Sequence, residues 1–212
     1  LAWYRPDSEK KSLVHQKKYI QKIGDECEKY SIPFLLELLV YPFQNDVNHT
    51  TEYSEQHQKK TNFVIESVKE FAKDKYKVDI FKLESPVSSS LLKNNITKKT
   101  KKAFNDLGKA TKNKPWVMLS SGMSKVSFYN CLKLAYKNGA SGYLAGRTIW
   151  LEAFNEYPNI NKVKHKLKND SVNFIKKLNY LTEHNAQSLE TYFDKGFKIN
   201  RSGSFTNNYR GF

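Results

Sequence analysis

The sequence predicts an α/β fold built on a parallel sheet, and three observations support this. Short apolar runs alternate along the 212 residues with longer amphipathic stretches. One run, 32–40, is nearly continuous, as expected of a strand buried on both faces of a parallel sheet. The helical stretches between runs are long enough for βαβ crossovers. The chain is long enough for one domain with a sizeable core.

The first predicted helix covers residues 8–30, where Leu13, Ile20 and Cys27 recur at helical spacing and Ser8 is the expected N-cap. Further helices are predicted at 57–74, 96–112 and 124–138, the last ended by Gly139. The predicted strands are 32–40, 78–83, 115–119 and 142–145, with the remnant of a fifth at 1–4.

The rest of the chain is more polar. Residues 42–56 are turn-rich and predict a loop, 159–194 predict one or two surface helices, and the tail 200–212 is expected to be mobile. We therefore divide the chain into a main domain, 1–158, and a C-terminal helical extension with its tail, 159–212. Four clear strands fit either a small doubly wound sheet or part of a (β/α)8 barrel, and composition does not separate the two.

Charge and cysteine content restrict the class of protein. The net charge of +15 would suit a nucleic-acid partner, but the lysines are spread as doublets along helix-like stretches, which favours solvated helix faces. Cys27 and Cys131 do not make a disulfide framework and indicate a cytoplasmic protein with reduced thiols. No apolar stretch is long enough to span a membrane, and no secretory leader is visible at the start.

Two charged residues interrupt predicted buried strands. Glu37 lies in the run 32–40, and Lys82 lies in 78–83, where strand alternation places Lys82 and Glu84 on one face. A lysine in a dry interior can attack a carbonyl as a free amine and form a Schiff base, and a nearby carboxylate can move protons. A buried Lys–Glu ion pair without chemistry explains these residues equally well.

Two strand-to-helix loops carry small residues and an arginine. Ser120, Ser121 and Gly122 follow one strand, and Gly146 and Arg147 follow the next. Exposed backbone N–H groups at a helix start and a guanidinium group favour an anion such as phosphate. Barrels often hold phosphate with their last two such loops.

Four segments together resemble the tagatose 1,6-bisphosphate aldolase family and its relatives, the sulfofructose-phosphate aldolases. They read FLLE at 34–37, DIFKLESP at 79–86, PWVMLSSG at 115–122 and GASGYLAGRTIW at 139–150. The resemblance covers about residues 1–158. It implies a (β/α)8 TIM barrel of which the chain carries only the later βα units, about strands 4–8, plus C-terminal helices.

The resemblance also implies a function. Lys82 matches the Schiff-base lysine and Glu37 the acid/base glutamate, with Glu84 a candidate helper; the residues that match the C1-phosphate loops are Ser120, Ser121, Gly122, Gly146 and Arg147. The implied reaction cleaves a ketose 1-phosphate to dihydroxyacetone phosphate and an aldehyde, without cofactor or metal. The five histidines form no ligand-like cluster in the sequence.

Three alternatives stay open at this stage: a sulfofructose-phosphate substrate, a truncated non-catalytic protein and a polyanion-binding protein. The expected partner is a phosphorylated sugar, with neither nucleic acid nor membrane. Because the first barrel strands have no counterpart, we expect a fragment or truncated copy, or a chain that pairs with another copy or with a missing N-terminal half.

Overall fold

The computed structural model describes residues 1–41, 61–93 and 96–192. The predicted loop 42–56, the first residues of the predicted helix 57–74 and the predicted tail 200–212 lie outside these ranges. None of the helices in the described part combines the length and apolarity that a membrane crossing needs. Cys27 and Cys131 are both free thiols.

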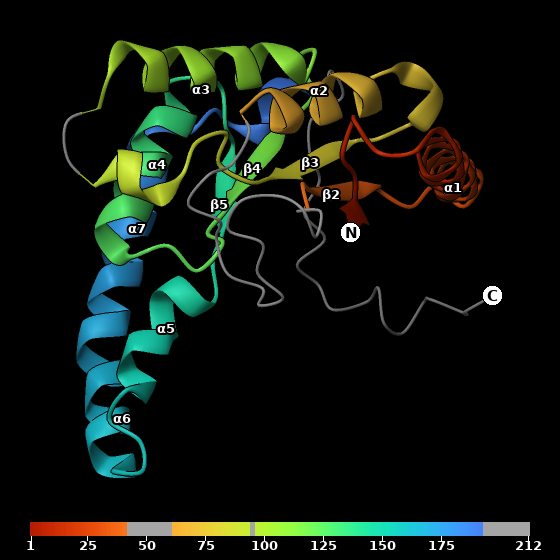
Figure 1. Cartoon of the computed structure of the whole chain (residues 1–212). Helices are drawn as coiled ribbons and strands as arrows, with labels where there is room; N and C mark the ends of the chain where they lie inside the picture. The colour runs from red at the N-terminus through yellow and green to blue at the C-terminus, as the bar shows by residue number, and fades with distance from the viewer. Residues whose placement is uncertain (42–60, 94–95, 193–212) are drawn as a thin grey trace.

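A parallel sheet forms the centre of the described structure (Figure 1). Its five strands are β1 (Ala2–Trp3), β2 (Leu35–Leu39), β3 (Ile80–Leu83), β4 (Trp116–Leu119) and β5 (Gly142–Leu144). Their spatial order is their chain order, and every neighbouring pair is parallel. The predicted α/β fold and the strand at 1–4 are confirmed. An order without reversal argues against the doubly wound alternative, which requires a switch point.

Seven helices accompany this sheet within the described residues. They are α1 (Lys10–Lys29), α2 (Thr61–Phe71), α3 (Lys98–Ala110), α4 (Lys125–Tyr136), α5 (Arg147–Phe154), α6 (Ile160–Lys166) and α7 (Val172–Asn185). A π-helical turn, Leu167–Ser171, joins α6 to α7, and short 3-10 turns occupy Asp74–Tyr76, Ser89–Leu92 and Leu189–Tyr192. In Figure 1, α2 and α3 lie above the sheet and α1 and α4 lie at its two ends. The opposite face, turned downward, is not covered by α1–α4.

The core lies between the sheet and these helices. Phe81 and Leu83 of β3 are almost completely buried there, with Trp116 and Met118 beside them on β4. Strand alternation sends the intervening residues to the other face. There the prediction that 32–40 is buried on both faces is wrong, because Leu35 is 42% exposed. No described helix packs against that side of β2, where Leu35 and Glu37 are partly exposed and Leu39 is buried, so the second face is only partly buried.

Several predicted boundaries shift. Helix α1 begins after Glu9, which is its N-cap, so Ser8 is not the cap; its hydroxyl instead lies 2.5 Å from the Tyr41 hydroxyl. Gly139 does end α4, in the left-handed conformation (φ 88°). Helix α5 was not predicted, because it is short and begins with Gly146-Arg147, which resembles a loop. The expected surface helices after residue 159 are confirmed as α6 and α7.

Glu70 of α2 connects three elements on the helical side. Its carboxylate accepts hydrogen bonds from Lys73 and from the Tyr76 hydroxyl, each 2.5 Å, and lies 3.5 Å from the Lys17 ammonium group of α1. Burial raises the pKa of Glu70, but these hydrogen bonds and the positive charges outweigh it and lower the pKa to about 2. Glu70 is therefore ionised in the folded protein well below the pH at which it is protonated in the unfolded chain.

This shift predicts an acid-sensitive contribution to stability. Because the folded pKa is depressed, Glu70 stabilises the fold above its unfolded pKa, and this is lost as pH falls from there toward 2. We expect Glu70→Gln to lower the free energy of unfolding by about 2–3 kcal/mol at pH 7, and by much less at acid pH. Urea denaturation of both proteins at pH 7 and near pH 2.5 measures this. An equal loss at both pH values would contradict the assignment.

Candidate active site

Lys82 and Glu37 meet on the face of the sheet that α1–α4 do not cover. They are paired in register on β3 and β2, and their side chains form an ion pair with 2.8 Å between Nζ and Oε2. The lysine side chain is 24% exposed and the carboxylate 18%. The sequence predicted each residue on its strand, and the register brings them together. The pair is therefore half-buried but open to a molecule that approaches this face.

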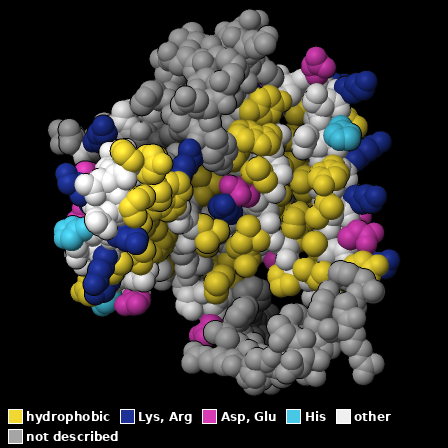
Figure 2. Space-filling view, turned by 90° about the horizontal axis from the view of Figure 1, so that it is seen from below, with side chains coloured by type: hydrophobic (Ala, Val, Ile, Leu, Met, Phe, Trp, Pro, Cys, Tyr) yellow, Lys and Arg dark blue, Asp and Glu magenta, His cyan; other side chains and the backbone are white. Residues whose placement is uncertain are grey.

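The surroundings of the pair are mainly apolar. Val117 on β4 is in register with Lys82, and Gly142 on β5 is in register with Val117. A side chain at Gly142 would contact Val117, at 3.5 Å from Cβ to Cγ1, so the glycine leaves space beside that row. Figure 2 shows the downward face of Figure 1, where hydrophobic side chains gather around a few charged ones. An amine and a carboxylate in contact within such a surface can exchange a proton.

Glu84 lies just beyond the end of β3 and is only 4% exposed. Its carboxylate accepts a hydrogen bond of 2.8 Å from the backbone N–H of Val40, directly after β2. This bond ties together the ends of the two strands that carry Glu37 and Lys82. The geometry gives Glu84 a positioning role for these strands, in addition to the helper role that the sequence predicted.

The two predicted phosphate loops also lie next to each other. The chain turns sharply after β4, because Ser121 and Gly122 both have positive φ angles, 48° and 74°. Ser120 donates its backbone N–H to Leu144 at the end of β5, at 3.2 Å. The Arg147 guanidinium group lies over Gly122, since a Cβ at this glycine would be 3.5 Å from Cζ. The structure thus brings Ser120–Gly122 and Arg147 together at one end of the sheet.

Two residues of α5 belong to this region and were missed in the sequence. The hydroxyl of Thr148 is buried and has no hydrogen-bond partner within the described part of the chain. The indole nitrogen of Trp150 lies beside Gly146, where a Cβ would be 3.6 Å away. Thr148 gave no signal in the sequence. Trp150 could have been found, because it follows Gly146 by four residues at a helix start, and residues at this spacing lie on the same face of a helix.

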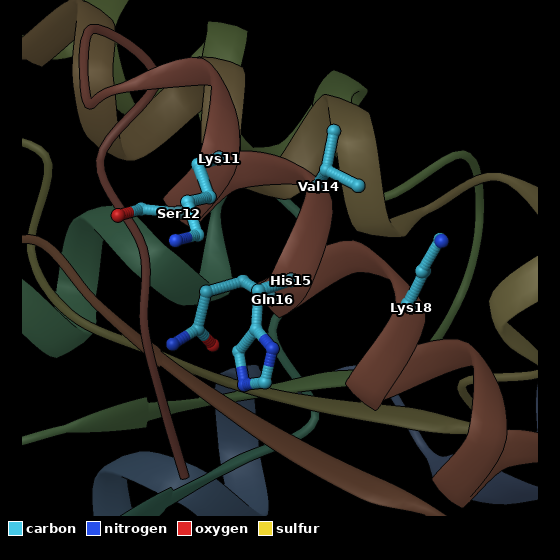
Figure 3. A pocket seen from close by; sticks show the side chains of 6 residues that line it. All are labelled: Lys11, Ser12, Val14, His15, Gln16 and Lys18. Carbon is cyan, nitrogen blue, oxygen red and sulfur yellow. The ribbon is translucent and has the colours of Figure 1, made fainter.

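Two surface hollows lie away from these residues. One, of about 440 Å³, is lined by residues of α1: Lys11, Ser12, Val14, His15, Gln16 and Lys18 (Figure 3). The other lies along the start of α6, between Glu156 and Lys166. Neither includes a predicted site residue. The Lys82–Glu37 pair therefore lines neither of these two hollows.

Comparison with known proteins gives a family match over most of the chain. The model of the family described as DeoC/LacD family aldolase matches residues 2–152. The tagatose 1,6-diphosphate aldolase 1 of Enterococcus faecalis is 36% identical over 160 residues, which cover 72% of this chain and 48% of that protein. The tagatose 1,6-diphosphate aldolase of Staphylococcus epidermidis is 32% identical over 166 residues, covering 74% and 50%.

The chain spans about half the length of the curated relatives it matches. Among solved structures, a crystal structure of an archaeal fructose 1,6-bisphosphate aldolase superposes with a TM-score of 0.48 at 14% identity, covering 80% of this chain and 52% of that one. The resemblance predicted from the four sequence segments is confirmed by the family match.

Proposed function

This chain belongs to the DeoC/LacD family of aldolases, and on that basis we propose that the protein is a class I, Schiff-base aldolase with Lys82 as its imine-forming residue. The observation that carries the proposal is the contact between the Lys82 amine and the Glu37 carboxylate, 2.8 Å apart on the face of the sheet that α1–α4 do not cover. An amine and a carboxylate in contact and both partly exposed can be reached by a carbonyl substrate and can exchange the protons that imine formation requires.

The pair can perform the steps of the reaction. Glu37 accepts a proton from the Lys82 ammonium group, and the free amine attacks the C2 carbonyl of the substrate. The protonated Glu37 returns its proton to the carbinolamine hydroxyl, which leaves as water and forms the iminium ion. Glu37 then takes the proton of the C4 hydroxyl while the C3–C4 bond breaks, and the bonding electrons move into the iminium ion to form an enamine. Protonation at C3 and hydrolysis release the ketone product and restore Lys82.

We propose a ketose 1-phosphate derivative, such as tagatose 1,6-bisphosphate, as the substrate. The relatives named above are tagatose 1,6-diphosphate aldolases, which favours this substrate over a sulfofructose phosphate. Its C1 phosphate would bind at Ser120, Ser121, Gly122, Gly146 and Arg147, where the Arg147 guanidinium group at the start of α5 lies over Gly122. The products would be dihydroxyacetone phosphate and an aldehyde phosphate.

For the fold, we propose that residues 1–158 form the later βα units of a (β/α)8 barrel, with β1–β5 as its strands 4–8. Five parallel strands in unreversed order, with α2 and α3 covering one face, support this. Residues 159–212 would then be a C-terminal extension. Its described part contains α6 and α7, and the π-helical turn between them contacts α5 through the Ser171 hydroxyl, which donates to the Ile149 carbonyl at 2.7 Å.

Cleavage of tagatose 1,6-bisphosphate tests the proposal directly. The released dihydroxyacetone phosphate is measured through its enzymatic reduction in a coupled assay, which is run with and without a chelator. We expect release that the chelator does not affect, because the carbon–carbon bond is broken through the imine. Release that a chelator abolishes would contradict a Schiff-base mechanism.

Arg147 provides a separate test of the phosphate loops. We expect Arg147→Lys to weaken substrate binding about tenfold to a hundredfold, because a lysine cannot provide the bidentate hydrogen bonds of a guanidinium group. The value of KM should rise while kcat changes little. Lys125→Ala is the control, because Lys125 is also close to α5, where its Nζ pairs with Glu152 at 2.7 Å. Equal effects of the two substitutions would contradict a phosphate role for Arg147.

A further inference from the structure

Packing in the described part of the chain does not explain why residue 142 is a glycine. Gly142 lies in β5 without a positive φ angle, and an added Cβ would meet only Val117, at an ordinary contact distance of 3.5 Å. By contrast, a Cβ at Gly24 would lie 2.1 Å from the Tyr76 carbonyl oxygen, and Gly139 has a φ of 88°. A glycine weakens a strand, and it often marks a place where a ligand approaches closely.

Gly142 ends a row of residues that are in register across four strands. The row runs from Glu37 on β2 through Lys82 on β3 and Val117 on β4 to Gly142 on β5. Partners in register point to the same face of a sheet, and the short distance from Gly142 to the Val117 side chain agrees with this. Adjacent strands are about 4.8 Å apart, so Gly142 lies roughly 10 Å from Lys82. The row therefore changes from a carboxylate and an amine to an apolar side chain and then to an empty position.

The proposed reaction gives this row a direction. Lys82 attacks C2 and Glu37 takes the proton of the C4 hydroxyl, so C3 and C4 lie toward β2. C1 then lies on the other side of Lys82, over β4 and β5. The proposed phosphate residues are on that side as well, because Gly122 follows β4 and Arg147 follows β5. The ketose therefore lies across the strands rather than along one of them.

We propose that Gly142 is a specificity-determining residue, whose missing side chain leaves the room for the C1 phosphate ester of a ketose that lies across the strands. Val117 forms the apolar floor beneath C1, between the imine on Lys82 and the empty position. This inference rests on the proposed function, since it concerns the same site. A side chain at position 142 would fill the space of the phosphate ester, whereas a ketone without phosphate does not reach that far.

A binding experiment tests this room without imine chemistry. The probe is glycerol phosphate, which carries a phosphate ester but no carbonyl, and titration calorimetry measures its Kd. We expect Gly142→Val to weaken binding by about tenfold to a hundredfold through overpacking, and Gly142→Ala to weaken it less. Both variants should fold, because alanine makes only an ordinary contact with Val117 and valine favours a strand, and circular dichroism checks this. Unchanged binding by both variants, or no binding to the unsubstituted chain, would overturn the proposal.

A second experiment compares two ketones that differ only in the phosphate. Borohydride traps the imine that Lys82 forms with dihydroxyacetone phosphate or with dihydroxyacetone, and the ketone concentration that gives half-maximal trapping is measured. We expect Gly142→Val to raise this concentration by about tenfold to a hundredfold for the phosphorylated ketone and to change it little for the other. An equal rise for both ketones would show that the valine disturbs Lys82, and would overturn the proposal.

Leu35→Phe is the matched control for the valine variant. It also enlarges a side chain on this face of the sheet, but Leu35 is in register with Ile80, outside the row that ends at Gly142. We expect it to leave trapping of both ketones unchanged. A selective loss of the phosphorylated ketone in Leu35→Phe as well would overturn the assignment of the room to position 142.

The two proposals fail in distinguishable ways. If Gly142→Val weakens the binding of glycerol phosphate but no imine is trapped on the folded chain, the role of Gly142 is supported and the Schiff-base proposal fails. If both ketones are trapped on Lys82 equally well with and without Gly142→Val, the Schiff-base proposal is supported and the role of Gly142 fails.

Discussion

Lys82→Arg is expected to reduce cleavage of tagatose 1,6-bisphosphate to the uncatalysed background. Arginine keeps the positive charge and can keep the contact with Glu37, so the ion pair across β2 and β3 is preserved. A guanidinium group does not lose its proton in proteins and cannot attack a carbonyl as an amine. The imine step is therefore lost while the fold and the local charge are retained, and the coupled assay measures the loss.

The chain offers a matched control for this variant. Lys69 forms an ion pair with Glu66 on the surface of α2, with 2.7 Å between Nζ and Oε1. Lys69→Arg makes the same chemical change in a similar pair outside the proposed site, and we expect it to leave activity unchanged. Comparable activity of Lys82→Arg and Lys69→Arg would show that Lys82 is only a structural partner of Glu37.

Glu37→Gln is expected to lower kcat by roughly 10²–10⁴-fold, the usual contribution of a general acid or base. The glutamine oxygen can still accept the hydrogen bond that Lys82 donates at 2.8 Å, so the amine remains in place. The amide cannot take the proton from Lys82 or from the substrate hydroxyl. Both imine formation and bond cleavage should slow, while KM for the phosphorylated substrate changes much less.

Glu66→Gln is the control for this second variant, because it neutralises the acid of the α2 surface pair. We expect no change in kcat and only a small change in stability, since an exposed pair contributes little. A kcat for Glu37→Gln within a few-fold of the unchanged protein would contradict the acid/base role of Glu37 and leave Lys82 without an assigned proton acceptor.

The sheet could be predicted because its strands have a strong local signal. Apolar runs around Leu36 and Phe81 stand out, since a strand that packs under helices needs large side chains at alternate positions. The helix starts were harder to predict from the sequence. Ser8 resembles an N-cap, but its hydroxyl is close to Tyr41, a tertiary contact that local sequence does not reveal. Helix α5 was missed for a different reason, because it is short and its start carries loop-like residues.

The candidate site could be predicted only residue by residue. Lys82 and Glu37 stood out because each interrupts an apolar run, but their pairing depends on the register between β2 and β3. The contact of Arg147 with Gly122 likewise depends on how two loops meet at one end of the sheet. The exposure of Leu35 could not be foreseen, because burial depends on what covers the second face of a strand.

The most direct test of the central claim is borohydride reduction of the folded protein in the presence of dihydroxyacetone phosphate, followed by intact mass and peptide mapping. An imine on Lys82 would be reduced to a stable amine, so we predict one adduct per chain, located in the peptide that contains Lys82. No adduct on a folded sample, or an adduct on another lysine, would contradict the assignment of Lys82 as the Schiff-base residue.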